Sequence, residues 1–186
     1  MIMKHLGSQK LESEHVILRP FELTDVDQAY QHWTSDPEVT KYLTWPSHQS
    51  PAVTKKVISQ WVANYSRPDF YQWAIVLKTS NEVIGSISVV DIKEKISAVH
   101  IGYAIGKKWW GLGITTEAFK RLIPFFFDEV GVNRIESMHD PKNPASGKVM
   151  KHCGLVYEGT LRQADRNNQG LCDAAYYGLL REDYYR

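Results

Sequence analysis

Residues 106–117 combine glycines, cations and the start of a helix in a pattern that favours a phosphate-containing ligand. Gly111 and Gly113 stand between an expected strand and an expected helix. Glycine lets a backbone approach a ligand closely, and the first turn of a helix offers unpaired N–H groups and the positive end of the helix dipole. This combination predicts an anion site, most naturally for a pyrophosphate.

Two familiar phosphate motifs do not fit this turn. A Walker A loop needs Lys followed by Ser or Thr after its second glycine, whereas Leu112 follows Gly111. A dinucleotide fingerprint needs a third glycine where Thr116 stands, and the strands upstream have the pattern of an antiparallel meander. A turn that uses glycine for its geometry alone stays open as the alternative.

The strand expected over residues 97–105 has one large apolar face and one small face. The small face leaves room for a ligand to approach the backbone, and His100 is its one large side chain. Because imidazole titrates near neutral pH, His100 is a candidate general base or the anchor of a water relay. A solvent-facing histidine without a role is the alternative. The apolar face, which is predicted to lie in the core, consists of Val99, Ile101, Tyr103 and Ile105.

An aromatic loop over residues 42–48 separates two expected helices. Trp45 and Tyr42 are candidate contacts for a second substrate, although tryptophan more often packs in a core or at its rim. This loop and the polar turn over residues 167–170 are predicted to form the substrate groove. Loop sequences of this kind do not identify the molecule that they bind.

Other catalytic constellations find little support in the sequence. The seven histidines show no His-x-x-x-His spacing and the two cysteines no Cys-x-x-Cys spacing, so no metal site is expected. The Gly-x-Ser-x-Gly elbow of a serine hydrolase is missing. Cys153 stands near the end of an expected helix among apolar residues, which favours a buried structural thiol over a nucleophile.

Composition and charge narrow the class of protein further. The chain has 186 residues, 43% of them apolar, which fits one domain with a sizeable core. Its 22 Lys and Arg residues balance 21 Asp and Glu residues, so no nucleic-acid partner is expected. Two cysteines, no apolar leader and no apolar run of membrane-helix length predict a cytoplasmic protein without membrane attachment.

Hydrophobic periodicity and turn residues predict an α+β fold, as a single domain over residues 1–186 in which residues 1–10 are a loose N-terminal segment. The helix after the glycine turn contains Pro124, which predicts a kink in its interior. The expected strands cover residues 15–21, 71–77, 82–90, 97–105, 134–139, 155–162 and 172–180, and the expected helices cover residues 24–35, 51–65, 115–130 and 143–153.

Several segments, in this order, resemble the GCN5-related N-acetyltransferase (GNAT) family. The K-x-x-G-x-G motif over residues 108–113, followed by ITTEA, is similar to the acetyl-CoA loop of that family. Residues 143–159, with N-x-x-S at their start, are similar to the branch that acetylates ribosomal-protein N-termini, the RimJ/RimL-like group. The LRPF of residues 18–21 and the D-x-x-x-Y of residues 173–177 extend this likeness, which covers about residues 15–184.

The resemblance implies a mixed, mostly antiparallel sheet flanked by helices and splayed between its fourth and fifth strands, residues 97–105 and 134–139. Acetyl-CoA is the implied cosubstrate, with its pantetheine arm in the gap between these strands, and no metal is implied. The residues that the resemblance assigns to acetyl-CoA are Tyr103, Ile105, Lys108, Trp110, Gly111, Leu112, Gly113, Ile114, Thr115, Asn143, Ser146, Met150 and His152.

Four positions depart from the family pattern. His100 stands where relatives often carry Glu, Lys108 where many carry Arg or Gln, and His152 where this branch usually has Lys. Met150 takes the position of a proton-donating Tyr, and a thioether donates no proton. Ser146, which the resemblance places near the cofactor sulfur, is then the candidate to stabilise the departing thiolate. A contact with the pantetheine arm, or a helix cap, is its alternative role.

The resemblance and these residues together predict an N-acetyltransferase that moves acetyl from acetyl-CoA to an amine, by direct transfer in a ternary complex, with His100 and Ser146 as catalytic residues. The branch implies that the acceptor is the N-terminal α-amine of a ribosomal or other protein, or of a peptide. Acetylation of a small amine (a polyamine, amino acid or antibiotic) and an acyl-CoA-binding module without turnover are the alternatives. The protein is expected to be a monomer or a homodimer.

Overall fold

An open sheet of eight strands forms the centre of the molecule, which a computed structural model describes over residues 3–186. The strands lie in the order β1-β2-β3-β4-β5-β6-β8-β7, and each neighbouring pair is antiparallel except β5 with β6. Their bounds are β1 Leu11–Glu12, β2 Val16–Arg19, β3 Gln72–Leu77, β4 Val83–Lys93, β5 Ala98–Ile105, β6 Arg134–His139, β7 Val156–Asn167 and β8 Gly170–Leu180. The α+β fold expected from the sequence, with its mostly antiparallel sheet, is confirmed.

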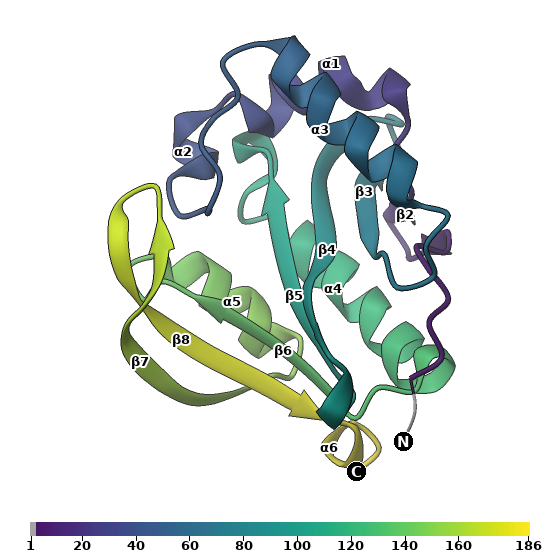
Figure 1. The fold of residues 1–186 in the computed structure, drawn as a ribbon, viewed down its shortest axis with the longest axis vertical. Coiled ribbons are helices and arrows are strands. Elements are labelled where there is room, and N and C mark those ends of the chain that lie inside the picture. The colour runs from purple at the N-terminus through teal and green to yellow at the C-terminus, as the bar shows by residue number, and fades with distance from the viewer. Residues whose placement is uncertain (1–2) are drawn as a thin grey trace.

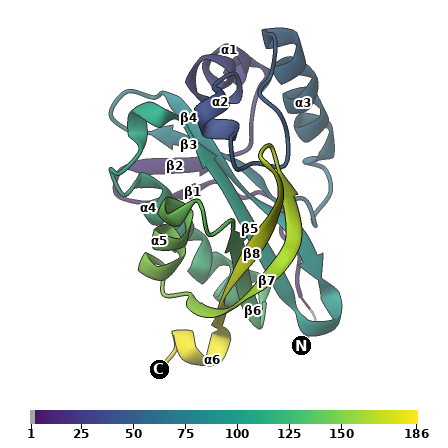
Figure 2. The same ribbon diagram turned by 90° about the vertical axis from the view of Figure 1, so that its left-hand side faces the viewer.

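Helices cover both faces of this sheet (Figures 1 and 2). On one face, Trp33 and Ile58 are buried against β3 in a core cluster beneath α1 and α3. On the other face, α4 and α5 contribute Phe119 and Met150 to a larger core cluster. The helices are α1 Val26–Ala29, α2 Pro37–Thr40, α3 Pro51–Asn64, α4 Ile114–Pro124, α5 Pro144–His152 and α6 Arg181–Tyr184.

Strand β5 divides these two cores, as its alternating sequence predicts. Val99, Ile101 and Ile105 are buried in the cluster beneath α4 and α5, and Tyr103 packs against it. Ala104, on the opposite face, packs against the cluster beneath α1 and α3. Each face of β5 therefore meets a different layer of helices, which follows from the period of two in a strand.

The helix after the glycine turn changes its pitch at the expected proline. Helix α4 ends at Pro124, and the chain continues as a π-helix over Phe125–Val130. Proline lacks the N–H for the i→i−4 bond and its ring crowds the preceding turn, which accounts for the end of the regular α-helix at this residue. Burial of three consecutive phenylalanines holds this irregular segment in place.

The first helical region is more irregular than a single helix over residues 24–35. It begins as a 3-10 turn over Leu23–Asp25, continues as α1 and ends as a π-helix over Tyr30–Thr34. Asp25 fixes its start, because the buried carboxylate accepts two hydrogen bonds of 2.8 Å from Arg19 and one from the Glu22 N–H. The sequence pattern locates this region but does not predict its 3-10 and π turns.

The N-terminal segment is packed on the molecule instead of being loose. Met3 is buried, the Lys4 N–H donates to the Val130 carbonyl at 2.8 Å, and the indole N–H of Trp73 donates to the Gln9 carbonyl at 2.7 Å. The expectation of a loose segment over residues 1–10 is therefore wrong for residues 3–10, while Met1 and Ile2 lie outside the described residues. The segment lacks hydrophobic periodicity, so a local pattern does not predict these tertiary hydrogen bonds.

The C-terminal hairpin of β7 and β8 reaches across to the loop that follows α2 (Figure 1). Strand β7 runs to Asn167, beyond the residue 162 expected from the sequence, and its partner β8 begins at Gly170. The longer hairpin brings the polar turn over residues 167–170 beside residues 40–45. Between Met3 and Arg186, the structure has no helix with the length and apolar character that a membrane span requires.

Candidate active site

Strands β5 and β6 part soon after they meet, and the gap between them is the centre of the site. Within residues 3–186 their pairing comprises Ala98 with Arg134, Val99 with Ile135 and His100 with Glu136. The buried Ser137 hydroxyl donates to the Ile101 carbonyl at 2.7 Å, which satisfies the first β5 acceptor beyond the ladder. The splay expected between the fourth and fifth predicted strands is thus confirmed, as Figure 1 shows.

The separation leaves backbone groups of β5 facing the gap. In a strand, the N–H and C=O of one residue point to the same edge, and successive residues point to opposite edges. The Ile101 carbonyl points towards β6, since it accepts from Ser137. The N–H of Tyr103, two residues further along, therefore points to the same edge and is available to a ligand in the gap.

The glycine turn joins β5 to α4 at the open end of this gap. Gly111 and Gly113 have φ values of +75° and +77°, and Gly113 is the N-cap of α4. These positive φ values favour glycine at both positions, and the space in front stays open because nothing lies within 4 Å of a Cβ built at either one. Ile114 and Thr115 are buried, so their contribution to a ligand would come from backbone N–H groups in the first turn.

Other residues of the turn differ in what they offer to a ligand. Trp110 and Leu112 are exposed, and the Trp110 indole N–H donates to the Ile105 carbonyl at 2.9 Å. The Lys108 ammonium lies 3.9 Å from a Glu82 carboxylate oxygen and 5.0 Å from the centre of the Trp109 ring. The predicted contact of Lys108 with the cofactor remains a prediction.

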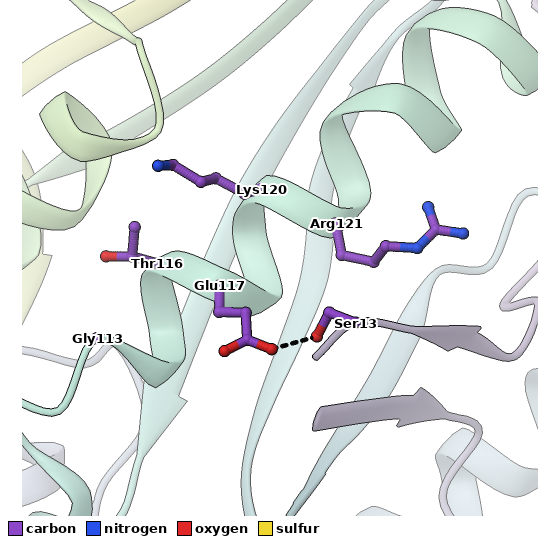
Figure 3. Close-up of a pocket in the computed structure, with 6 residues that line it drawn as sticks. All are labelled: Ser13, Gly113, Thr116, Glu117, Lys120 and Arg121. Atoms are coloured by element: carbon purple, nitrogen blue, oxygen red, sulfur yellow. Dashed lines mark hydrogen bonds between the residues drawn. The ribbon is translucent and has the colours of Figure 1, made fainter. Parts of the chain in front are cut away.

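A cavity of about 390 Å³ lies beside the first turns of α4 (Figure 3). The Glu117 carboxylate turns towards the N-terminal segment, where it accepts from Ser13 Oγ at 2.6 Å and from the N–H and Nδ1 of His15. Burial raises the pKa of Glu117, but these hydrogen bonds outweigh burial and lower it. Two cations, Lys120 and Arg121, also border the cavity, and its walls are Ser13, Gly113, Thr116, Glu117, Lys120 and Arg121.

The sequence reasoning missed Lys120 and Arg121. A pair of basic residues two turns into the helix that follows a glycine turn was the available signal. Both side chains extend from α4 at the cavity, and Glu117 points away from Lys120 (Figure 3). The acidic side chain in the wall is thus already paired, so the cavity presents a net positive charge to a ligand.

Helix α5 contacts β5 through a pair of hydroxyls, one from Tyr103 and one from Ser146. The Tyr103 hydroxyl lies 2.9 Å from the Ser146 carbonyl oxygen and 3.0 Å from Ser146 Oγ. Asn143 is the N-cap of α5, and its side chain makes no capping bond within the described part of the chain. The Ser146 hydroxyl and the Asn143 amide are thus polar groups at the start of α5.

Two further predicted contacts with the cofactor, Met150 and His152, lie on α5. Met150 has no exposed surface and belongs to the core cluster, so its side chain fills the core and offers no surface to a cofactor. His152 is exposed at the last residue of the helix. The family resemblance assigns both residues to acetyl-CoA. Burial of Met150 speaks against a side-chain contact, and the contact of His152 remains a prediction.

His100 lies on the other face of β5 from Tyr103, at the closed end of the gap. Its side chain is 11% exposed, and its Nδ1 lies 3.7 Å from a carboxylate oxygen of Glu136. Burial lowers the pKa of His100, and the Glu136 charge opposes this shift only in part. A neutral imidazole at this position can accept a proton at neutral pH.

Glu136 is a buried charge that the sequence reasoning did not single out. It accepts from the Lys93 ammonium and from Arg134 Nε at 2.8 Å, and Arg134 also pairs with Glu158. Burial raises the pKa of Glu136, but the bonds from Lys93 and Arg134 outweigh it and lower the pKa. A carboxylate in the middle of a buried strand was the signal in the sequence.

The loop after α2 meets the β7–β8 hairpin, as expected for the walls of one groove. Trp45 is partly buried with its ring 5.2 Å from that of His48, and Tyr42 carries the Lys41 ammonium 5.2 Å from its ring centre. Asn168, at the tip of the hairpin, donates to the Trp45 carbonyl at 2.8 Å. The structure therefore brings these two segments together, and substrate contacts by Tyr42 and Trp45 remain a prediction.

The cysteines have no nucleophilic character in this structure. Cys153 and Cys172 are free thiols and both are buried. Burial raises the pKa of Cys153 to about 12, so its reactive thiolate is scarce at neutral pH. The interpretation of Cys153 as a buried structural thiol is confirmed. No group of three His, Cys, Asp or Glu side chains that could hold a metal ion occurs in residues 3–186.

Known proteins resemble this chain in sequence over most of its length. A family model described as an acetyltransferase (GNAT) domain matches residues 15–156. The chain is 32% identical over 177 residues to the uncharacterized N-acetyltransferase p20 of Bacillus licheniformis, covering 95% of this chain and 98% of that protein. It is 29% identical over 139 residues to the ribosomal-protein-serine acetyltransferase of Escherichia coli K12, covering 74% of this chain and 76% of that protein.

Solved structures share the fold at lower identity. The GNAT-family acetyltransferase of Bacillus anthracis matches with a TM-score of 0.83 and 23% identity, over 94% of this chain and 99% of that one. The microcin C7 self immunity acetyltransferase MccE, solved with acetyl-CoA and AMP, matches with a TM-score of 0.81 and 22% identity, over 90% and 93%. With a family model that covers most of its length, the chain belongs to the GNAT family and is an acetyl-CoA-dependent N-acetyltransferase.

Proposed function

We propose that this enzyme acetylates the N-terminal α-amine of a protein or peptide. The observation that carries the proposal is that β5 parts from β6 beyond His100, while His100 and Tyr103 lie on opposite faces of β5. An amine on the His100 face and a thioester on the Tyr103 face can then reach the same edge of β5. The name of the E. coli relative, a ribosomal-protein-serine acetyltransferase, supports a protein as the acceptor.

The glycine turn and the adjoining cavity are proposed to hold the phosphate groups of acetyl-CoA. The open space at Gly111 and Gly113 lets the first N–H groups of α4 meet the pyrophosphate. Lys120 and Arg121 would face the remaining phosphate in the cavity, since Glu117 is occupied by Ser13 and His15. The residues proposed for the site range from Ser13 to Asn168. This span supports our proposal that the chain is one catalytic domain.

The backbone of β5 is proposed to polarise the thioester. The N–H of Tyr103 faces the gap and can donate to the thioester carbonyl oxygen as negative charge develops there. The amine nitrogen forms a bond to the carbonyl carbon, whose π electrons move to that oxygen. When the electrons return, the C–S bond breaks and the sulfur leaves as a thiolate.

His100 is proposed to receive the proton that the amine loses, directly or through a water. An α-amine has an ordinary pKa of about 7.7–8.0, so much of it is already neutral near pH 8 and the base has modest work to do. The buried imidazole of His100 is neutral at this pH, because burial holds its pKa below the ordinary value. Ser146 is proposed to donate a hydrogen bond to the leaving thiolate from the opposite face.

Mass spectrometry of a substrate panel tests this proposal. Purified enzyme and acetyl-CoA are incubated with decapeptides that differ in their first residue, each with a free or a blocked N-terminus. We expect an acetyl group on the α-amine of free peptides and none on blocked ones. Transfer to spermidine or to free amino acids alone would overturn the acceptor class in favour of a small amine.

A further inference from the structure

Asn168 joins two segments of the chain that are more than 120 residues apart. Its side-chain Nδ2 donates to the carbonyl oxygens of Thr40 and Trp45, both at 2.8 Å, and its backbone N–H donates to the Leu43 carbonyl at 3.1 Å. Asn168 therefore donates three hydrogen bonds to the backbone of one short loop. Asn168 is itself exposed, so these bonds are not a by-product of burial.

The two segments that Asn168 joins are anchored on opposite sides of the gap between β5 and β6. Asn167 donates from Nδ2 to Asp140 at 2.9 Å, which fixes the hairpin tip next to the end of β6. The loop is fixed on the β5 side, where the His48 N–H donates to the Thr34 carbonyl at 2.8 Å. Asn168 thus bridges the open end of the gap, whereas the ladder from Ala98 to His100 closes the other end.

The bridge fixes the backbone around the predicted acceptor contacts. Asn168 holds the carbonyls of Thr40, Leu43 and Trp45, which flank or include Tyr42 and Trp45. A loop held at three points keeps its side chains in few orientations, so less conformational entropy is lost when a ligand binds. Without Asn168, the loop would have to be ordered by the ligand.

We propose that Asn168 is a positioning residue for the acceptor: it orders the loop of residues 40–45 across the open end of the gap and thereby sets the KM for the amine substrate. This inference rests on the proposed acceptor groove. The inference predicts different effects on the binding of the two substrates, because the acetyl-CoA contacts proposed above lie on the glycine turn and α4. Loss of the bridge should weaken acceptor binding and leave acetyl-CoA binding intact.

Three variants test the proposal. Asn168→Asp keeps the shape of the side chain but loses both Nδ2 donors, and Asn168→Ala removes the side chain. Arg166→Gln is the matched control, because Arg166 is exposed on β7 of the same hairpin, lies outside the turn of residues 167–170, and keeps its backbone pairing with Leu171. Steady-state kinetics with the best peptide of the panel give the KM of each substrate, and calorimetry gives the Kd of acetyl-CoA.

We expect Asn168→Asp and Asn168→Ala to raise the acceptor KM about tenfold or more, with acetyl-CoA Kd within about twofold of wild type. Amide exchange of residues 40–48 should become faster in both variants, and Arg166→Gln should match wild type. An unchanged acceptor KM, even with a lower Tm, would overturn the proposal, because the bridge would then serve stability alone. Equal losses for both substrates would overturn it as well.

Two safeguards keep the test decisive. If Asn168→Ala gives no cooperative melt, Asn168→Ser, which keeps the backbone N–H and a small side chain, takes its place in the same comparison. The wild-type enzyme separates this inference from the proposed function. If it acetylates a small amine but no peptide, the acceptor class fails, and the KM comparison is made with that amine.

Discussion

The Tyr103 hydroxyl and Ser146 join β5 to α5 by contacts of 2.9 Å to the Ser146 carbonyl oxygen and 3.0 Å to Ser146 Oγ. A carbonyl oxygen only accepts, so the single proton of Tyr103 goes to it and the Ser146 hydroxyl must donate. Burial raises the pKa of Tyr103, which keeps the phenol protonated. Ser146 is therefore the donor between the two hydroxyls, which fits the hydrogen bond to a leaving thiolate that we propose for it.

Removal of this donor should slow catalysis without weakening the cofactor. We expect Ser146→Ala to lower kcat about tenfold or more and to leave the Kd of acetyl-CoA nearly unchanged, because the lost bond forms only as charge develops on sulfur. Steady-state kinetics and calorimetry measure the two quantities. A weaker Kd with a normal kcat would make Ser146 a binding residue and leave the thiolate to depart unaided.

The glycine turn should fail selectively when a side chain enters it. Gly113→Asp places a Cβ at a φ of +77°, at a strain of about 1 kcal/mol, and adds a negative charge where a pyrophosphate is expected. We expect the Kd of acetyl-CoA to rise about tenfold or more by calorimetry, while the thermal melt stays cooperative. Unchanged affinity would contradict the assignment of this turn.

Gly131 provides the matched control for that variant. It too has a positive φ, +81°, with nothing within 4 Å of a built Cβ, and it caps the π-helix away from the glycine turn. Gly131→Asp carries the same backbone strain and the same charge. It should lose a similar amount of stability and keep the wild-type Kd.

His100 should govern the acidic limb of the pH–rate profile. Because burial lowers its pKa below the ordinary value of 6.5, the imidazole becomes neutral, and active as a base, as pH rises through that lowered pKa. We expect His100→Ala to lower kcat about 10- to 1000-fold and to remove this limb. The measurement is kcat/KM from pH 5 to 9, and an unaltered limb in the variant would leave water as the base.

Glu136 should contribute to stability in a defined range of pH. Its folded pKa lies below the ordinary 4.5, so its charge stabilises the fold above that value, and this stability is lost as pH falls through the folded pKa. Glu136→Gln leaves Lys93 and Arg134 without their shared carboxylate and should cost about 2 kcal/mol at pH 7.

Urea unfolding at pH 7 and at pH 3.5 measures this effect. The free-energy difference between wild type and Glu136→Gln should shrink at the lower pH, where the wild-type carboxylate begins to take up its proton. The double variant Glu136→Gln with Lys93→Met is the control, since it removes a buried charge and one of its partners together. A difference that stays constant between the two pH values would show that packing, not charge, is responsible.

The features that the sequence predicted well are those with a local cause. The strand over Arg134–His139 was placed at its observed bounds, and the alternation that buries Val99 and Ile101 was correct. The turn with Gly111 and Gly113 was recognised because positive φ, an open approach and a helix start all lie within a few residues. Period and turn chemistry suffice for such features.

The features that it missed depend on residues far apart in the chain. Nothing near Asn168 indicates that its amide binds the Thr40 carbonyl, and nothing near Gln9 indicates that Trp73 donates to it. The family resemblance assigns Met150 to acetyl-CoA, yet the core encloses its side chain. Burial and long-range partners are properties of the packed layers, which local patterns do not encode.

The two enclosed thiols simplify the measurement of turnover. Cys153 and Cys172 are free and buried, and burial raises the pKa of each. A chromogenic disulfide reagent reacts with thiolates that it can reach, so in the folded enzyme it should register the thiol of released CoA over a low background. Adding denaturant at the end exposes both protein sulfhydryls, and their absorbance calibrates the enzyme concentration in the same cuvette.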